Sequence, residues 1–169
     1  MSAADQILKN FNLFVDGRGY AGNCPTFRPP ALQVLEEEFR AGGLDAPIKV
    51  DMGMEALEAS FTLTKFAPEV LALWGLSDGT GKQITARGAV QNLNGTVEPV
   101  IVNLAGNIRA VESGDWVAGE KVENEFTVSV VSYKYTQAGR LIHHIDVPNM
   151  IRIVNGVDHL AAIRDAIGL

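Results

Sequence analysis

The stretch KVENEFTVSVVSYKYT, residues 121–136, decides the fold class, because apolar and polar residues alternate along it. Phe126, Val128 and Val130 share one face of the predicted strand, and the residues between them are polar. This period of two predicts a half-buried antiparallel strand. After Val131 two tyrosines occupy the face that begins as polar, so the pattern predicts either a bulge that shifts the register or burial of that face.

The same alternation recurs over most of the chain. It predicts strands in residues 11–16, 55–64, 82–91, 97–111 and 141–154. The turn sequence DGRG at 16–19 indicates a short hairpin, and Pro148 restricts the last strand to a sheet edge or a bend. Short helices are predicted at 67–75 and 158–167. The fold class is therefore mainly β, an antiparallel sandwich or barrel with two short helices on its outside.

Composition limits the classes of function. The chain has 169 residues, 47% of them hydrophobic, and a mean hydropathy of +0.10, which predicts one ordered domain spanning 1–169 and excludes a disordered chain. The net charge of −6 is concentrated, with −5 in residues 33–60 and −4 in residues 112–125. This acidic balance argues against specific binding of nucleic acid. Acidic patches on a mildly basic body suit contact between copies, and they suit solvated loops equally well.

Targeting signals and cysteines give little positive information. Residues 1–14 have no apolar core of the kind a secretory signal requires, and no stretch approaches the roughly 18 apolar residues of a membrane helix. We therefore expect synthesis and folding in the cytoplasm and no membrane segment. Cys24 is the single cysteine, which excludes an intrachain disulfide and a cysteine-rich metal site.

Tests for site chemistry predict no catalytic, cofactor-binding or metal-binding residues. The segment GLSDGTGK, residues 75–82, has five residues rather than four before its Gly-Lys pair, and Gln83 follows where a P-loop has Ser or Thr. His143 and His144 point to opposite faces of a strand, so at most two of the candidate metal ligands in 143–146 share a face.

The segment EEEFRAGGLDAPIKVDMGM, residues 36–54, does not fit a closed monomer. It breaks at Gly42-Gly43 and Pro47, and its apolar residues have no clean period. Long loops in compact domains are uncommon and usually functional. The residues leave two alternatives open: the loop docks on another copy, or it folds onto its own sheet.

Two strings carry a resemblance that covers essentially the whole chain: LKNFNLFVDGRGYAG, residues 8–22, and FRAGGLDAPIKVDMGMEALEASFTL, residues 39–63. They resemble the major tail tube proteins of contractile-tailed phages, a family that also supplies the tubes of R-type pyocins, which are phage-tail-like bacteriocins. The resemblance implies β-sandwich or barrel-like subunits that form hexameric rings, stacked into a hollow tube inside a contractile sheath. About 24 strands in such a ring would leave a lumen about 38 Å wide, enough for a DNA duplex.

Site residues are expected on two surfaces. Contact between subunits is expected at Phe39, Arg40, Gly42, Gly43, Leu44, Val50, Met52 and Met54. A polar lumen wall is expected at Glu58, Ser60, Thr62, Glu123, Glu125, Thr127 and Ser129. Carboxylates and small hydroxyl groups on such a wall would repel a passing polyanion instead of holding it.

The resemblance also implies partners: further copies of the chain, a sheath protein, baseplate or hub proteins, a tail terminator and a tape-measure protein in the lumen during assembly. DNA would be passing cargo in a phage, and ions would pass in a bacteriocin. The particle would assemble in a bacterial host and be released by lysis. The alternatives are the tube of a bacterial secretion apparatus, a soluble ligand-binding β-barrel, or a metal-dependent enzyme using His144, Asp146 and His159.

Overall fold

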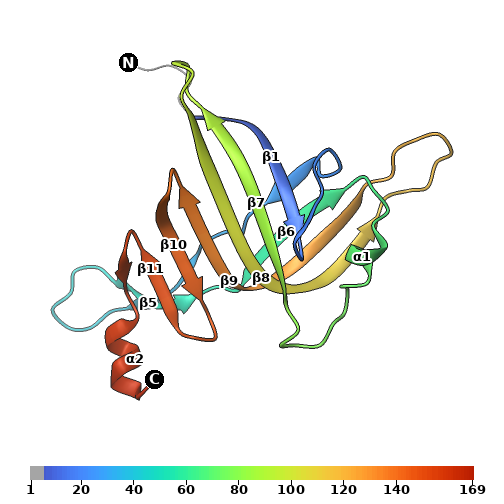
Figure 1. The fold of residues 1–169 in the computed structure, drawn as a ribbon. Coiled ribbons are helices and arrows are strands. Elements are labelled where there is room, and N and C mark those ends of the chain that lie inside the picture. The colour runs from blue at the N-terminus through green and yellow to red at the C-terminus, as the bar shows by residue number, and fades with distance from the viewer. Residues whose placement is uncertain (1–5) are drawn as a thin grey trace.

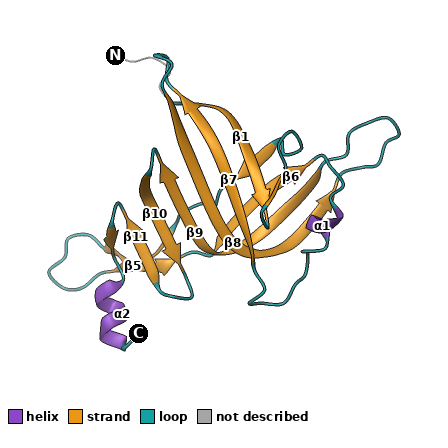
Figure 2. Cartoon of the chain, viewed as in Figure 1, coloured by secondary structure: helices purple, strands orange, loops and turns teal. Residues whose placement is uncertain are grey.

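The computed structural model describes residues 6–169, and most of them lie in antiparallel strands (Figures 1 and 2). The prediction made for the start of the chain falls partly on residues 1–5 and so lies partly outside the described residues. The strands are β1 (Ile7–Val15), β2 (Arg18–Gly19), β3 (Thr26–Arg28), β4 (Val34–Phe39), β5 (Ile48–Met54), β6 (Leu57–Leu63), β7 (Lys82–Gln91), β8 (Val97–Ser113), β9 (Asn124–Gln137), β10 (Arg140–Asp146), β11 (Ile151–Val154) and β12 (Val157–Asp158). The helices are α1 (Pro68–Leu71) and α2 (Ala161–Ile167). The mainly β class predicted from the alternation is confirmed.

The main sheet has the order β12-β11-β10-β9-β8-β7-β1-β2, with antiparallel pairing throughout. Its hairpins follow the turn signals of the sequence. Asp16 and Gly17 both have positive φ, of 50° and 79°, as the tight turn between β1 and β2 requires. Pro148 lies in the turn between β10 and β11, so the bend predicted within 141–154 is confirmed.

The two longest strands, β8 and β9, belong to two sheets (Figure 1). Their first and second halves are separated by a register shift, where Ala105 pairs with Ser132 but Gly106 pairs with Val130. Val131 is the residue left over, so the predicted bulge is confirmed. Beyond the bulge, the amino-terminal half of β9 also pairs with β6, and β6 pairs with β3. β3, β6, the first half of β9 and the second half of β8 form a shorter sheet that packs on the main one.

The core lies between the inner faces of these two sheets. Phe61 on β6 stacks on Phe126 of β9, with ring centroids 5.0 Å apart, and both side chains are 1% exposed. The main sheet contributes Leu13, Ile84 and Leu104, all fully buried. The apolar faces read from the alternation of β6 and β9 are therefore the faces that pack the core.

Both helices are shorter than predicted. α1 ends at Leu71 rather than at residue 75, because Trp74 forms a parallel bridge with Ile108 and the Gly75 N–H donates to the Ile108 carbonyl. At the other end of the chain, residue 158 belongs to β12 and α2 begins at Ala161, with no fully buried residue. No helix among residues 6–169 combines the length and the apolar character that a membrane crossing needs.

The segment 36–54, expected as an irregular loop, is largely a β-hairpin. β4 and β5 pair as a separate two-stranded sheet, with a register shift between Val34 and Glu36. Residues 40–47 alone are irregular and form the loop that extends beyond β11 and α2 in Figure 1. The expectation of a loop without period was wrong: Ile48, Val50 and Met52 in β5 alternate, whereas in β4 Glu37 interrupts the apolar face between Leu35 and Phe39.

Candidate interaction surfaces

The β4–β5 hairpin is amphipathic and its apolar face is open to solvent. Successive side chains of a strand point to opposite faces, so five apolar side chains share one face. They are Leu35, Phe39, Ile48, Val50 and Met52, each between 40% and 55% exposed. Glu36, Glu38, Lys49 and Asp51 share the opposite face, where Lys49 Nζ lies 3.6 Å from Glu36 Oε2.

An ion pair holds the charged face of the hairpin to the body. Arg152 Nη2 on β11 donates to Asp51 Oδ2 at 2.8 Å, and the Arg152 side chain is only 17% exposed. This hydrogen bond, together with one from the Gly53 N–H, lowers the pKa of the Asp51 carboxyl below its usual value of 3.8. Because the face with Asp51 is turned toward β11, the apolar face is turned away from the chain's own body.

The residues expected at contacts between subunits occupy three different places. Phe39, Val50 and Met52 lie on the apolar face, all at least 40% exposed. Arg40, Gly42, Gly43 and Leu44 lie in the exposed loop that joins the two strands. Met54, at the base of β5, is half-buried and packs against the chain's own core, which makes it a structural residue of the monomer.

The residues expected to line a lumen form one continuous polar face. The pairs Glu58–Ser129, Ser60–Thr127 and Thr62–Glu125 lie directly opposite each other on β6 and β9. Glu123 comes immediately before β9 and is exposed. The sequence identified the two strands separately, and their antiparallel register brings the two polar faces together. β8 extends this face, because Glu112 lies opposite Glu125.

A second polar face, on the outside of the main sheet, was not identified as a unit from the sequence. It is made by residues of β1, β7, β8 and β9 that lie opposite one another: Asn12, Thr85, Arg87, Asn103 and Lys134. Thr85 Oγ1 donates to Asn103 Oδ1 at 3.0 Å. These residues become neighbours through the register of four strands, and the sequence does not predict that register. Compared with the face on β6 and β9, this one has no carboxylate among the five.

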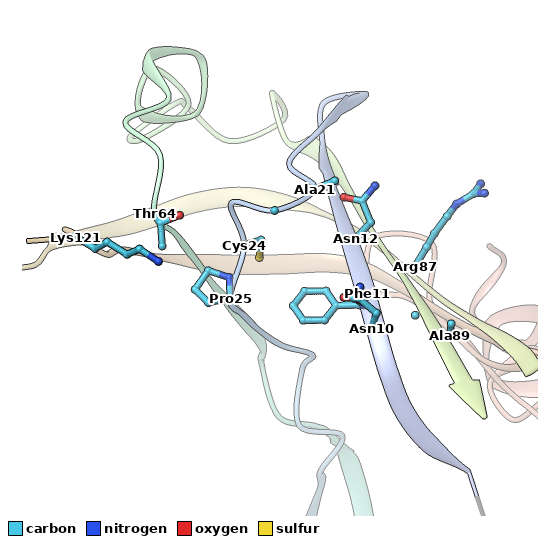
Figure 3. A pocket seen from close by; sticks show the side chains of 12 residues that line it. Asn10, Phe11, Asn12, Ala21, Cys24, Pro25, Thr64, Arg87, Ala89 and Lys121 are labelled. Carbon is cyan, nitrogen blue, oxygen red and sulfur yellow. Dashed lines mark hydrogen bonds between the residues drawn. The ribbon is translucent and has the colours of Figure 1, made fainter. Parts of the chain in front are cut away.

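A hollow of about 620 Å³ adjoins β1 and holds Cys24 (Figure 3). Cys24 Sγ lies 3.3 Å from the Thr26 carbonyl, and burial raises the pKa of the thiol to about 11. A thiol is a nucleophile as its thiolate, and burial disfavours that form of Cys24. Figure 3 shows Lys121 pointing toward Pro25 and Arg87 pointing away from Phe11.

The histidines and aspartates considered as metal ligands have structural contacts. His143 lies on the inner face, with its ring 6.1 Å from that of Tyr135, whereas His144 lies opposite Lys134 on the outer face. Burial, and then the charge of Lys134, lowers the pKa of His144. Asp146 accepts hydrogen bonds from the amide groups of Asn149. Within residues 6–169, no three His, Cys, Asp or Glu side chains cluster as a metal site.

An exposed aromatic pair at the far end of the shorter sheet also escaped the sequence reading. Phe66 and Trp116 meet edge to face with ring centroids 6.0 Å apart, and they are 52% and 80% exposed. Trp74, 58% exposed, is held against β8, where its indole N–H donates to the Arg109 carbonyl at 3.0 Å. An isolated aromatic residue in a loop has no periodicity, so the sequence held no signal for this patch.

Comparison with known proteins places these surfaces in context. The sequence matches the family described as phage tail tube protein FII over residues 5–168. It is 32% identical to the tail tube protein of Escherichia phage P2 over 168 residues, covering 96% of each chain. It is 25% identical over 146 residues to the major tail tube protein of Serratia phage KSP20, covering 85% of this chain and 84% of the relative. Among solved structures, a chain of the anti-feeding prophage baseplate aligns with a TM-score of 0.48 and 12% identity, covering 75% of this chain and 90% of that one.

Proposed function

Because the chain belongs to the phage tail tube protein FII family, we propose that it is the structural subunit of the inner tube of a contractile tail or tail-like particle. In this proposal residues 1–169 act as one tail-tube domain, six copies form a ring, and the rings stack into a hollow conduit. The conduit crosses the target envelope and passes DNA in a phage or ions in a bacteriocin. The role is structural and requires no catalysis.

The observation that carries the proposal is the exposed apolar face of the β4–β5 hairpin. Its apolar face points away from its own body, and an exposed face of five large apolar side chains is a liability in a monomer. A second copy of the chain covers such a face when a head-to-tail contact is repeated around a ring. Phe39, Val50 and Met52 are therefore the residues we propose for this contact, with 40–44 at the tip of the hairpin.

Deletion of the outer hairpin tests this role. A variant in which a short Gly-Ser linker replaces residues 39–50 should fold, because the hairpin is a sheet of its own. It should no longer sediment as tubes, whereas Glu38→Gln, a change on the charged face, should assemble as the parent does. Sedimentation and negative-stain imaging measure both properties. Tubes of normal length from the deleted variant would refute a role of the hairpin in assembly.

We propose that the polar face of β6 and β9 lines the lumen. Glu58, Glu125 and the hydroxyl side chains between them would present a wall that repels phosphate groups. Cysteine variants at Ser60 and Thr127, treated with a bulky thiol reagent that cannot enter a tube, should be labelled in monomers and protected in assembled tubes. Equal labelling in both states would instead assign this face to the outer wall.

The partners follow from the same proposal. A sheath would surround the tube, baseplate or hub proteins would begin it, a terminator would end it, and a tape-measure protein would occupy the lumen during assembly. DNA would contact the wall only while passing. The protein would be made in the host cytoplasm and leave the cell by lysis as part of the particle.

A further inference from the structure

We propose that the apolar face of the β4–β5 hairpin docks in a groove over β1 and β7 of a neighbouring copy. The inference rests on the proposed function and identifies the surface that receives the hairpin. We call this surface the β1 groove and define it by two adjoining hollows that share Phe11 and Gly88, one of about 180 Å³ and the other of about 620 Å³.

The smaller hollow supplies an apolar floor. It lies on the inner face of the main sheet and is lined by Leu8, Phe11, Phe27, Val100 and Tyr135, among others. Leu8 is 56% exposed at its mouth, although it points to the same face as the buried core residues Leu13 and Val15. On this inner face Leu13 and Val15 are covered by the rest of the core, whereas Leu8 stays exposed. β-Sheets pack face to face through apolar side chains, so the apolar face of a two-stranded hairpin can cover this floor.

The larger hollow supplies charge of the opposite sign to the hairpin. Its lining includes Lys121 and no carboxylate, while Arg87, which also borders it, belongs to the outer polar face of the main sheet. Lys121 has no ion-pair partner within 4.0 Å among residues 6–169. The hairpin carries Glu37 in the middle of its apolar face, opposite Val50, whereas Glu36 and Glu38 lie on its other face. A carboxylate on the docking face and an ammonium group in the groove favour docking in one orientation, and two copies of Glu37 oppose the pairing of two hairpins.

The positions of the two surfaces make the contact head-to-tail. The hairpin is fixed to β11, and the groove lies over β1 and β7 near the other end of the same sheet (Figure 1). A hairpin cannot reach its own groove without crossing β10, β9 and β8. Copies that each offer an arm at one end and a groove at the other form a closed ring or an open helix. A second copy of the chain is therefore the occupant that this arrangement fits.

Two variants, each defective in one surface, test the contact. Phe39→Glu places a charge on the hairpin, and Leu8→Glu places one in the groove; both positions are more than half exposed, so both variants should fold. Each alone should raise the concentration needed for assembly about tenfold or more. Leu8→Met, which keeps an apolar side chain, should assemble as the parent does. Lys121→Glu should weaken assembly and Lys121→Arg should not.

The mixture of the two defective variants gives the decisive result. The intact hairpin of the Leu8→Glu protein can dock in the intact groove of the Phe39→Glu protein, but no further copy can be added. We expect a one-to-one heterodimer by native mass spectrometry and sedimentation velocity, and no tubes. If Leu8→Glu forms normal tubes, or if the mixture stays monomeric, the β1 groove is not the receptor, and the tube function stands. If the parent protein forms no rings or tubes, both proposals fall.

Discussion

Replacement of Gly106 by alanine should destabilise the monomer more than any other single methyl group added to a glycine of this chain. Gly106 lies at the bulge where β8 leaves the main sheet. A Cβ atom built there would lie 2.1 Å from the Ser129 carbonyl oxygen and 3.0 Å from Val130 Cα. Both neighbours are backbone, so no side-chain rotation relieves the overlap.

The size of the effect follows from that distance. Carbon and oxygen atoms in contact normally lie about 3.3 Å or more apart, so the two strands must separate locally by roughly 1 Å. Such a separation strains the pairing of Gly106 with Val130 and opens the core beneath it. Overpacking of this kind typically costs about 1–3 kcal/mol, and we expect about 3 kcal/mol because backbone must move on both sides.

Urea unfolding of the monomer, isolated by size exclusion and followed by circular dichroism, measures this cost. With a slope of about 2 kcal/mol per molar urea, the midpoint should fall by about 1.5 M. Gly42→Ala is the matched control, because no atom lies within 4 Å of a Cβ there and its φ is not in the left-handed region. The control should change stability by less than about 0.5 kcal/mol. Equal midpoints for the two variants would refute the steric reasoning.

Three further outcomes follow from contacts described above. Asp51→Asn should speed cleavage of the hairpin by trypsin at Arg40 while leaving the urea midpoint nearly unchanged. In the parent protein the ion pair with Arg152 lowers the pKa of Asp51. Hydrogen exchange should therefore show a protected hairpin at pH values above 3.8, the ordinary pKa of the carboxyl, and loss of this protection as the pH falls below that value. Tyr20→Phe removes the hydrogen bond from the phenol to Glu69 at 3.1 Å and should cost about 1 kcal/mol in urea unfolding. Because burial, and then Glu69, raises the pKa of Tyr20 from 10 to about 12, its contribution is complete below pH 10 and is lost as the pH rises toward 12, so Tyr20→Phe should flatten this part of the alkaline stability profile. Phe126→Ala, which leaves a void beside a stacked ring, should cost about 3–5 kcal/mol, and a loss below about 1 kcal/mol would contradict a rigid core at that site.

The sequence predicted best where one strand has one buried face. In β6 and β9 the period of two identifies both the core residues and the polar face, because neither depends on which strand is the neighbour. The bulge near Val131 was visible for the same reason, as a break in the alternation. The pairing of Glu58 with Ser129 was not visible, since register is a property of two strands that are distant in sequence.

The features that were missed depend on tertiary contacts or on a partner. The predicted helix 67–75 stops at Leu71, because Trp74 and Gly75 pair with Ile108 of β8 instead of continuing the helix. The β4–β5 hairpin reads as a loop because Glu37 interrupts the apolar face of β4, and because Gly42, Gly43 and Pro47 separate the two strands. The β1 groove draws residues from several separate segments, so no local pattern could reveal it.

The continuity of β8 and β9 through both sheets has a mechanical consequence. In a sandwich made of separate strands, a load on one sheet reaches the other only across packed side chains. Here two uninterrupted strands of 17 and 14 residues carry such a load along covalent backbone from one sheet into the other. The sheets cannot shear past each other without bending both strands at Gly106 and Val131. A wall built from such units should respond to axial thrust as a stiff elastic body, with the bulge as its hinge.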